Sequence, residues 1–299
     1  MGKADENGEA YGPTPIGRRL MRILTVAFWA RIGVLLEGAT GIGKSAIYKQ
    51  LAEELNIEVR VVNLSLLEPP DLVGLPILKG DETIYARPRI LPTEGRGILV
   101  LEELNRAELY IQNPALELLT TGRVHEHQLP PGWIVCAAIN PAGGDYHVKP
   151  LDPAMSDRFL YLKVCADRLE WTFWAHSVGI HPAVLRVARV HDRFLEEVSP
   201  RRWAKTSELL GALTPEDLAD PTFLRPLLHG FLPPAWVEIL VEALQTQREA
   251  AEIDVAGLLC AYHNDRALRD AVKAFRNGRT DGLDEITHRV TGLVQGPRL

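Results

Sequence analysis

Eight consecutive residues, Gly38 to Ser45, have the types and the spacing needed to hold phosphate groups. Their sequence, GATGIGKS, fits the P-loop pattern G-x-x-x-x-G-K-S. Glycines in such a loop let successive backbone N–H groups turn toward an anion. Lys44 supplies a mobile positive charge for the β- and γ-phosphates, and the Ser45 hydroxyl can ligate Mg²⁺. The whole loop is therefore a candidate nucleotide contact: Gly38, Ala39, Thr40, Gly41, Ile42, Gly43, Lys44 and Ser45.

The residues on either side of this loop predict the elements that position it. The apolar run 32–36 predicts a strand, and residues 45–55 predict a helix because Ile47, Leu51 and Leu55 recur four apart. A helix N-terminus behind the loop adds its dipole and its free N–H groups to an anion site. A glycine-rich turn that binds nothing is the alternative, and the strand and helix around the loop favour the phosphate site.

Two adjacent carboxylates form the second candidate. Glu102 and Glu103 follow the apolar run 98–101, which predicts a buried parallel strand that ends at an active-site crevice. In P-loop enzymes the first such carboxylate holds Mg²⁺ and the next orients or deprotonates the attacking water. We predict these roles for Glu102 and Glu103. The alternative is that the pair only begins a solvated loop. This alternative is less favoured because the phosphate lysine, a helix and a strand precede the pair in the order expected of a P-loop enzyme.

A polar amide ends another apolar strand, predicted over residues 133–140. Asn140 can hydrogen-bond the γ-phosphate or the attacking water, whereas a turn-forming asparagine before Pro141 is the alternative. The downstream phrase LDPAMSDRF favours the functional interpretation. It places Arg158 next to an aromatic residue, directly before a strand predicted over residues 160–164.

The elements between these candidates are less regular. Residues 57–64 predict a further strand, and the insert 68–85, punctuated by proline and glycine, predicts either a hairpin or a plain surface loop. Residues 107–120 predict a helix that is irregular or restarts at Asn113-Pro114 and stops at Gly122.

The histidines and cysteines give only weak evidence for a metal site or a disulfide. His125 and His127 would share one face of a strand, but no third ligand follows nearby, so an exposed hairpin is favoured over a metal site. The cysteines lie far apart without C-x-x-C spacing, which predicts ordinary reduced residues: Cys136, Cys165 and Cys260.

Residues 166–299 predict helices broken by prolines, without a clear strand. Helices are expected around Glu170 to Ala175, over 182–191, over 236–248 and over 267–276. Their apolar residues are interpreted as a core stripe, with an aromatic box as the alternative: Trp171, Trp174, Val184, Leu185 and Val187.

Composition restricts the class of protein. The 299 residues are 46% hydrophobic, enough for a large core, and the net charge of −6 gives no general reason to bind nucleic acid or an anionic membrane. The apolar stretch 20–36 contains Arg22 and Arg31, which argues against a membrane span. The polar N-terminus has no signal-peptide pattern. A cytoplasmic protein is expected.

Taken in order, four phrases resemble the motif regions of AAA+ ATPases. GATGIGKS resembles Walker A, ILVLEELNRA resembles Walker B, AAINPAGGDYHVKPLDPAMSDRF resembles sensor 1 and the arginine finger, and SPRRW resembles sensor 2. The phrases LEELNRA and DPAMSDRF, with the DLVGLPI insert, resemble the MoxR family in particular. The resemblance is detailed from about residue 30 to 205 and weak beyond it.

This resemblance implies an α/β fold and a domain plan. We expect a flexible tail over 1–15, an AAA+ P-loop core with a five-stranded parallel sheet over 16–165, and a helical lid with a C-terminal helical extension over 166–299. It also implies ATP and Mg²⁺ as ligands and a homo-oligomer, usually a hexameric ring. Members of this family often act as chaperone-like remodellers with a von Willebrand factor A domain protein.

The resemblance gives two arginines their roles. Arg158 is expected to act on the γ-phosphate of the next subunit, as an arginine finger in trans. Arg201 is expected to reach bound nucleotide from the lid, with Arg202 as the fallback assignment. A surface or helix-cap role is the alternative for either arginine.

One departure separates the sequence from the family pattern, because Glu102 stands where the family normally has aspartate. The longer side chain predicts slow hydrolysis, and it is the one support for an alternative function, a nucleotide-gated scaffold with little turnover. A GTP-driven motor associated with nucleic acid is a third option, which the negative net charge disfavours.

Overall fold

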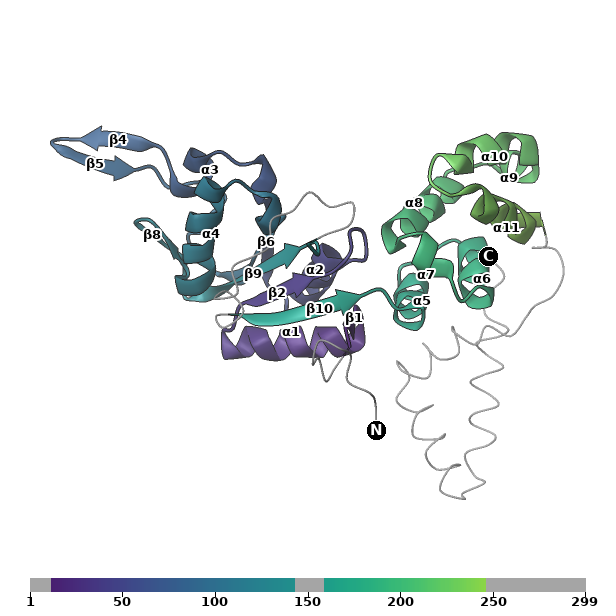
Figure 1. Cartoon of the computed structure of the whole chain (residues 1–299), viewed down its shortest axis with the longest axis horizontal. Coiled ribbons are helices and arrows are strands. Elements are labelled where there is room, and N and C mark those ends of the chain that lie inside the picture. Colours follow the sequence, from purple (N-terminus) through teal and green to yellow (C-terminus); the bar gives the residue numbers. More distant parts are fainter. Residues whose placement is uncertain (1–11, 143–158, 246–299) are drawn as a thin grey trace, which may run out of the picture. The chain divides into compact units, whose positions relative to one another are not determined.

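The computed structural model describes residues 12–142 and 159–245, and the chain divides into two compact units at Asp167 and Arg168 (Figure 1). The first unit contains the P-loop segment and the second is built from helices. Among the described residues, no helix combines the length and the apolar character that crossing a membrane requires.

A six-stranded parallel sheet forms the centre of the first unit, with the order β1-β10-β2-β9-β6-β3 (Figure 1). The strands are β1 (Thr14–Pro15), β2 (Val34–Glu37), β3 (Glu58–Asn63), β6 (Arg96–Glu102), β9 (Gly132–Ile139) and β10 (Leu160–Cys165). Because all six run parallel, the carboxyl ends of β2, β6 and β9 meet at one edge of the sheet. An α/β protein with a parallel sheet is confirmed.

The number of strands differs from the expected five. The additional strand, β1, pairs with the end of β10 and lies in the segment expected to be a flexible tail. A further bond, from the backbone N–H of Ile16 to the carbonyl of Cys165 at 2.9 Å, continues this pairing. Two residues are too few to show a strand period, so tertiary pairing alone specifies β1.

Two layers of helices cover the sheet because successive strand residues point to opposite faces. Val34 and Leu36 pack with α1 (Arg18–Ala30) and α2 (Lys44–Leu55), which lie on one face. Leu35 packs in the other cluster, with η1 (Leu64–Leu66), α3 (Pro69–Val73), η2 (Leu104–Arg106) and α4 (Leu109–Thr121). The predicted helix behind the P-loop is therefore confirmed, with Ile47 and Leu51 buried.

Helix α4 runs without a restart through Pro114, contrary to the expected irregularity. Buried residues on both sides of the proline, Ile111 and Ala115, anchor the helix to the core and offset the one donor that the ring removes. Gly122 ends α4 with φ 66°, as predicted.

Two hairpins branch from this α/β core. The insert forms the hairpin β4 (Pro76–Lys79) and β5 (Glu82–Tyr85), and the histidine segment forms β7 (Arg123–Val124) and β8 (His127–Gln128). The expected hairpin is confirmed for the histidine segment, and His125 is exposed. The expected shared strand face is wrong, because His125 lies in the turn with φ 52°, and the expected exposure is wrong for His127, which is 6% exposed with its Nε2 3.1 Å from the carbonyl oxygen of Val73.

The second unit is helical throughout its described part, residues 168–245. Its helices are α5 (Arg168–Ser177), α6 (Pro182–Val190), α7 (Phe194–Glu197), α8 (Pro200–Gly211), α9 (Pro215–Ala219), α10 (Pro221–His229) and α11 (Pro234–Gln245). The helix expected over 267–276 lies outside the described residues.

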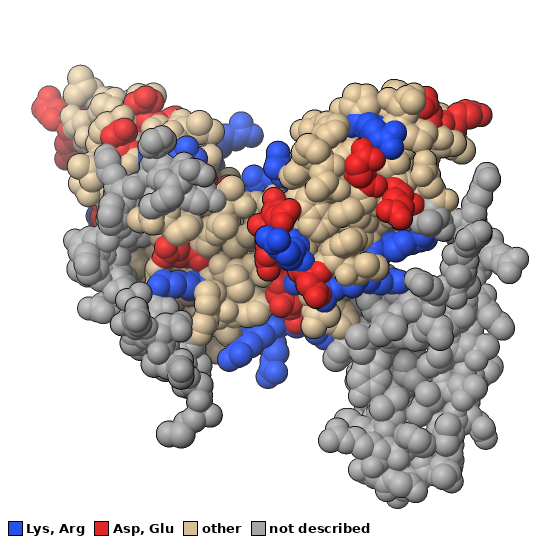
Figure 2. All heavy atoms as spheres, turned by 45° about the vertical axis from the view of Figure 1, so that its right-hand side comes forward, with Lys and Arg blue, Asp and Glu red and all other residues tan. Residues whose placement is uncertain are grey.

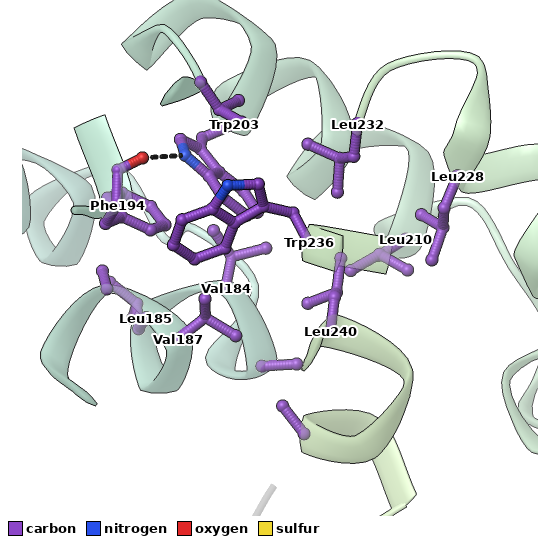
Figure 3. Close-up of a cluster of buried hydrophobic side chains, with 14 of the residues drawn as sticks. Val184, Leu185, Val187, Phe194, Trp203, Leu210, Leu228, Leu232, Trp236 and Leu240 are labelled. Carbon is purple, nitrogen blue, oxygen red and sulfur yellow. Dashed lines mark hydrogen bonds between the residues drawn. The ribbon is translucent and has the colours of Figure 1, made fainter. Parts of the chain in front are cut away.

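Aromatic rings pack among aliphatic side chains in the core of this second unit (Figure 3). The rings of Phe194 and Trp203 stack with centroids 4.3 Å apart, and Trp236 meets Trp203 edge-on at 5.6 Å. The indole N–H of Trp203 donates to the carbonyl of Phe194 at 2.9 Å, which satisfies the buried polar atom. Trp171 packs against Phe194 at 4.9 Å, so the predicted core stripe is confirmed over the aromatic box.

Candidate nucleotide-binding site

The loop from Gly38 to Ser45 connects the end of β2 to the start of α2. Gly43 caps α2 with φ 111°, a conformation that side-chain-bearing residues rarely adopt. A Cβ at Gly38 would lie 2.5 Å from the carbonyl oxygen of Val164, so this position also requires glycine. The loop therefore keeps its backbone open above the helix N-terminus, where an anion is favoured.

Lys44 turns its ammonium group back over the loop. Nζ donates to the carbonyl oxygens of Gly38 at 2.6 Å and Ala39 at 2.8 Å, and to the side-chain oxygen of Asn140 at 3.0 Å. An ammonium group has three protons to donate. A phosphate at this loop would take over some of these contacts.

Glu102 is the last residue of β6, and its carboxylate accepts a hydrogen bond from the Ser45 hydroxyl. Its Cα is paired in register with Asn63 of β3 on one side and with Ala138 of β9 on the other. The two residues predicted to hold Mg²⁺ are thus in direct contact across the loop and the sheet edge.

Glu103 follows in a left-handed conformation, with φ 57°. For a residue with a side chain this conformation is unfavourable, and three backbone bonds hold it. Its N–H donates to Ala138 at 3.1 Å, and its carbonyl accepts from Arg106 at 2.9 Å and from Ala107 at 3.1 Å. The carboxylate accepts from the Asn140 side-chain amide, at 3.0 Å to Oε1 and 3.1 Å to Oε2. The guanidinium of Arg106 lies 3.4 Å from the same carboxylate.

Asn140 therefore connects the two halves of the site. Its side-chain oxygen accepts from Lys44, and its side-chain nitrogen donates to Glu103. This arrangement fixes which end of the amide is oxygen, because Lys44 can only donate and an ionised carboxylate can only accept. Asn140 is 3% exposed, and its backbone carbonyl accepts a bond from the Asn105 side chain at 2.7 Å.

Behind the loop, Tyr48 and Cys136 are buried between α2 and the sheet. The Tyr48 hydroxyl donates to the carbonyl of Val34 at 3.0 Å. Burial raises the pKa of the Cys136 thiol to about 12, and burial also raises the pKa of Tyr48. These groups are neutral at physiological pH, and they support the loop as packing rather than as chemistry.

The structure brings five of the predicted site residues into two hydrogen-bonded sets, Lys44–Asn140–Glu103 and Ser45–Glu102. The two sets are adjacent in the chain, because Ser45 follows Lys44 and Glu103 follows Glu102. Arg158 lies outside the described residues. Arg201 belongs to the second unit, where it is exposed in the first turn of α8, and the fallback Arg202 is exposed beside it. The backbone N–H of Arg202 donates to the Ser199 hydroxyl, which caps this helix.

Sequence reasoning missed two residues that touch the first of these sets, Asn105 and Arg106. Both stand directly after the acidic pair in the phrase LEELNRA. A polar residue two positions beyond a strand end gives no periodic signal, so only the turn at Glu103 reveals that Asn105 folds back toward β9.

The donor set fits the ligands that the sequence predicts. Open glycine positions, a lysine and a helix N-terminus suit a polyphosphate. A hydroxyl and a carboxylate in contact are hard oxygen ligands of the kind that Mg²⁺ takes in small number. Among the residues that the structure describes, no cluster of three or more His, Cys, Asp or Glu side chains forms a metal site of another kind.

Charges of both signs lie close together on the face of the described residues shown in Figure 2. The described residues include exposed ion pairs, such as Lys205 with Glu208 at 2.6 Å and Arg225 with Glu238 at 2.8 Å.

Comparison with known proteins gives two curated relatives. A Staphylococcus epidermidis protein of uncharacterised function is 31% identical over 147 residues, covering 44% of this chain and 54% of that protein. The Holliday junction branch migration complex subunit RuvB of Prochlorococcus marinus is 32% identical over 136 residues, covering 42% of this chain and 33% of that protein. The chain thus spans about half the length of one curated relative and a third of the other.

Solved structures include the RuvB branch migration motor of Thermotoga maritima. It is 16% identical, with a TM-score of 0.46, and the match covers 88% of this chain and 78% of that one. Residues 33–159 match the family model of the AAA domain, dynein-related subfamily. That range contains the P-loop, both glutamates and Asn140, so the match to the AAA domain covers the part of the chain that carries the site.

Proposed function

We propose that this protein is a ring-forming ATP hydrolase of the MoxR type, which remodels or matures a partner protein. The observation that carries the proposal is the hydrogen-bonded group at the sheet edge, in which Asn140 joins the phosphate lysine to Glu103. A loop that only binds phosphate does not need a carboxylate connected to its lysine. Hydrolysis needs the lysine to bind the phosphates and the carboxylate to accept a proton.

Each residue has a defined task in this proposal. Lys44 and the loop N–H groups bind the phosphates, and Ser45 with Glu102 would hold Mg²⁺, which neutralises phosphate charge when bound. Glu103 accepts the proton of the attacking water, and Asn140 orients that water or the γ-phosphate. In the described state the carboxylate of Glu103 bonds to Asn140, so it must turn from the amide toward the water.

The ring, the two arginines and the partner rest on the family resemblance. Arg158 would complete a neighbour's site, since a head-to-tail interface closes into a ring when its rotation divides a full turn. Arg201 would sense nucleotide from the helical lid over 166–299. A von Willebrand factor A domain protein is the proposed partner, and the chaperone-like role and the cytoplasm are proposed on the same grounds.

The test compares the turnover of the wild type with that of Glu103→Gln, with ATP and with GTP. A large, Glu103-dependent ATP turnover supports the proposal, and equal rates for the two proteins would overturn the enzyme assignment. Strict use of GTP would overturn the assignment of ATP as the nucleotide. Mixing Arg158→Ala with Lys44→Ala subunits then tests the ring, because each variant is defective at a different side of a shared site, and mixed rings should recover turnover.

Two other functions remain as outcomes of these measurements. A scaffold that binds nucleotide with little turnover is favoured by Glu102 in place of the usual aspartate, and it predicts nucleotide-dependent assembly without phosphate release. A motor associated with nucleic acid is favoured by the 32% identity to RuvB over 136 residues. It predicts that DNA or RNA stimulates turnover.

A further inference from the structure

We propose that Asn105 is a positioning residue that sets the direction of Asn140 and thereby the state of Glu103. This inference deepens the proposed function and rests on it for the catalytic consequence. Asn105 is 2% exposed, and its side-chain nitrogen donates to the backbone carbonyl of Asn140 at 2.7 Å.

The path of the chain explains why a side chain, and not a backbone N–H, donates to the carbonyl of Asn140. The β6–β9 ladder ends in register at Glu102 and Ala138, and the N–H of Glu103 adds one more bond to Ala138. At Glu103 the backbone then turns away with φ 57°, so no later backbone donor of β6 continues along β9. The amide of Asn105 supplies that donor and extends the pairing to Asn140.

The residue after Asn140 makes this anchor important. Pro141 has no N–H, so it cannot hold the end of β9 through a donor of its own. The bond from Asn105 fixes the peptide plane at Asn140 and, with it, the direction in which that side chain leaves the backbone. The side chain can then reach Lys44 and Glu103 together, at 3.0 Å each.

Stability alone does not account for an asparagine at this position. The side-chain oxygen of Asn105 is buried and has no hydrogen-bond partner in the part of the chain that the structure describes. A buried acceptor without a partner lowers stability, and an apolar side chain of the same size would avoid that loss. The bond from the Asn105 side-chain nitrogen to the carbonyl of Asn140 explains the amide at this position.

The test replaces Asn105 with leucine, which keeps the number and branching of the side-chain heavy atoms and removes the donor, and with serine as a second variant in case leucine does not fold. Gln112→Leu is the matched control, because Gln112 is 8% exposed and its amide donates to the carbonyl of Ala107 at 2.8 Å, not to Lys44, Asn140 or Glu103. We expect Asn105→Leu to lower kcat at least tenfold with KM within threefold, and Gln112→Leu to leave kcat within twofold.

A second readout does not depend on hydrolysis. Hydrogen exchange of the Asn140 side-chain amide, followed by NMR in the full-length protein, should be at least tenfold faster in Asn105→Leu and unchanged in Gln112→Leu. If the wild type lacks Glu103-dependent turnover, the proposed function fails and this exchange rate alone decides the inference. Unchanged exchange, unchanged kcat in an active enzyme, or an equal loss of kcat in the control would each overturn it.

Discussion

The side-chain amide nitrogen of Asn140 lies within hydrogen-bond distance of both carboxylate oxygens of Glu103, at 3.0 and 3.1 Å. The oxygen of the same amide accepts from Lys44 at 3.0 Å. One side chain thus contacts the group proposed to bind phosphate and the group proposed to accept a proton. A change at the phosphate lysine is therefore transmitted to Glu103 through a single amide.

Replacing this amide with a carboxylate should impair hydrolysis. In Asn140→Asp the donor to Glu103 is lost and a like charge stands beside its carboxylate. The side chain can then no longer hold Glu103 and orient the γ-phosphate or the water. We expect a loss of roughly 10- to 1,000-fold in kcat near neutral pH. An unchanged kcat would contradict the contact.

Lys44→Ala should abolish most nucleotide affinity. Charge-assisted bonds to phosphate are lost, which corresponds to roughly a 10- to 100-fold weaker Kd for a fluorescent ATP analogue. Lys49→Ala is the matched control, since Lys49 is an exposed lysine on the same helix, α2. Equal affinity losses in the two variants would indicate a nonspecific charge effect.

Glu102→Asp tests the departure from the family pattern. The shorter side chain moves the carboxylate away from Ser45 by about one C–C bond and restores the usual residue at the proposed magnesium site. We expect faster turnover and a lower Mg²⁺ concentration for half-maximal rate, and chelation of Mg²⁺ should stop turnover in both proteins. If rate and Mg²⁺ dependence stay the same, Glu102 is not the cause of slow hydrolysis.

Trp203→Ala should destabilise the second unit strongly. Its ring is fully buried, stacks on Phe194 and lies edge-on to Trp236, and removal of such a ring costs about 3–5 kcal/mol of unfolding free energy. Trp29→Ala, at a tryptophan of the first unit that is 63% exposed, should cost under about 0.5 kcal/mol. Denaturant unfolding followed by circular dichroism measures both.

Alkaline pH should weaken the first unit through Cys136. The pKa of this thiol is raised to about 12 in the folded protein, so its contribution to stability is complete below pH 9 and is lost as the pH rises toward 12. Between pH 9 and 10.5 the loss is about 2 kcal/mol. Cys136→Ala should remove this part of the decrease in unfolding free energy with pH, measured by denaturant unfolding at several pH values. An identical pH dependence of the unfolding free energy in both proteins would contradict the burial effect.

Much of this site could be predicted because its residues follow apolar strands that are easy to recognise. The loop before α2, the acidic pair after β6 and Asn140 after β9 all stand where a strong hydrophobic pattern stops. Parallel strands then bring these ends together without further information. The two hydrogen-bonded sets, Lys44–Asn140–Glu103 and Ser45–Glu102, are the result.

What could not be predicted depends on contacts between distant segments. The strand β1 exists only through its pairing with β10, and His127 is buried only because Val73 offers a carbonyl. Asn105 matters only because Glu103 turns the chain back on itself. None of these leaves a periodic trace in the sequence.

The two edges of the sheet carry a consequence for self-association. On one side β1 ends in Pro15, which has no N–H to offer to a further strand. On the other side β3 carries the ion pair of Glu58 and Arg60 at 2.6 Å, and Arg60 also bonds to the carbonyls of Arg89 and Ile90. Both edges thus resist strand addition and the aggregation that it starts. In the proposed ring, contacts between copies of this chain are therefore expected to involve helices, loops and side chains and not the pairing of strands at these edges.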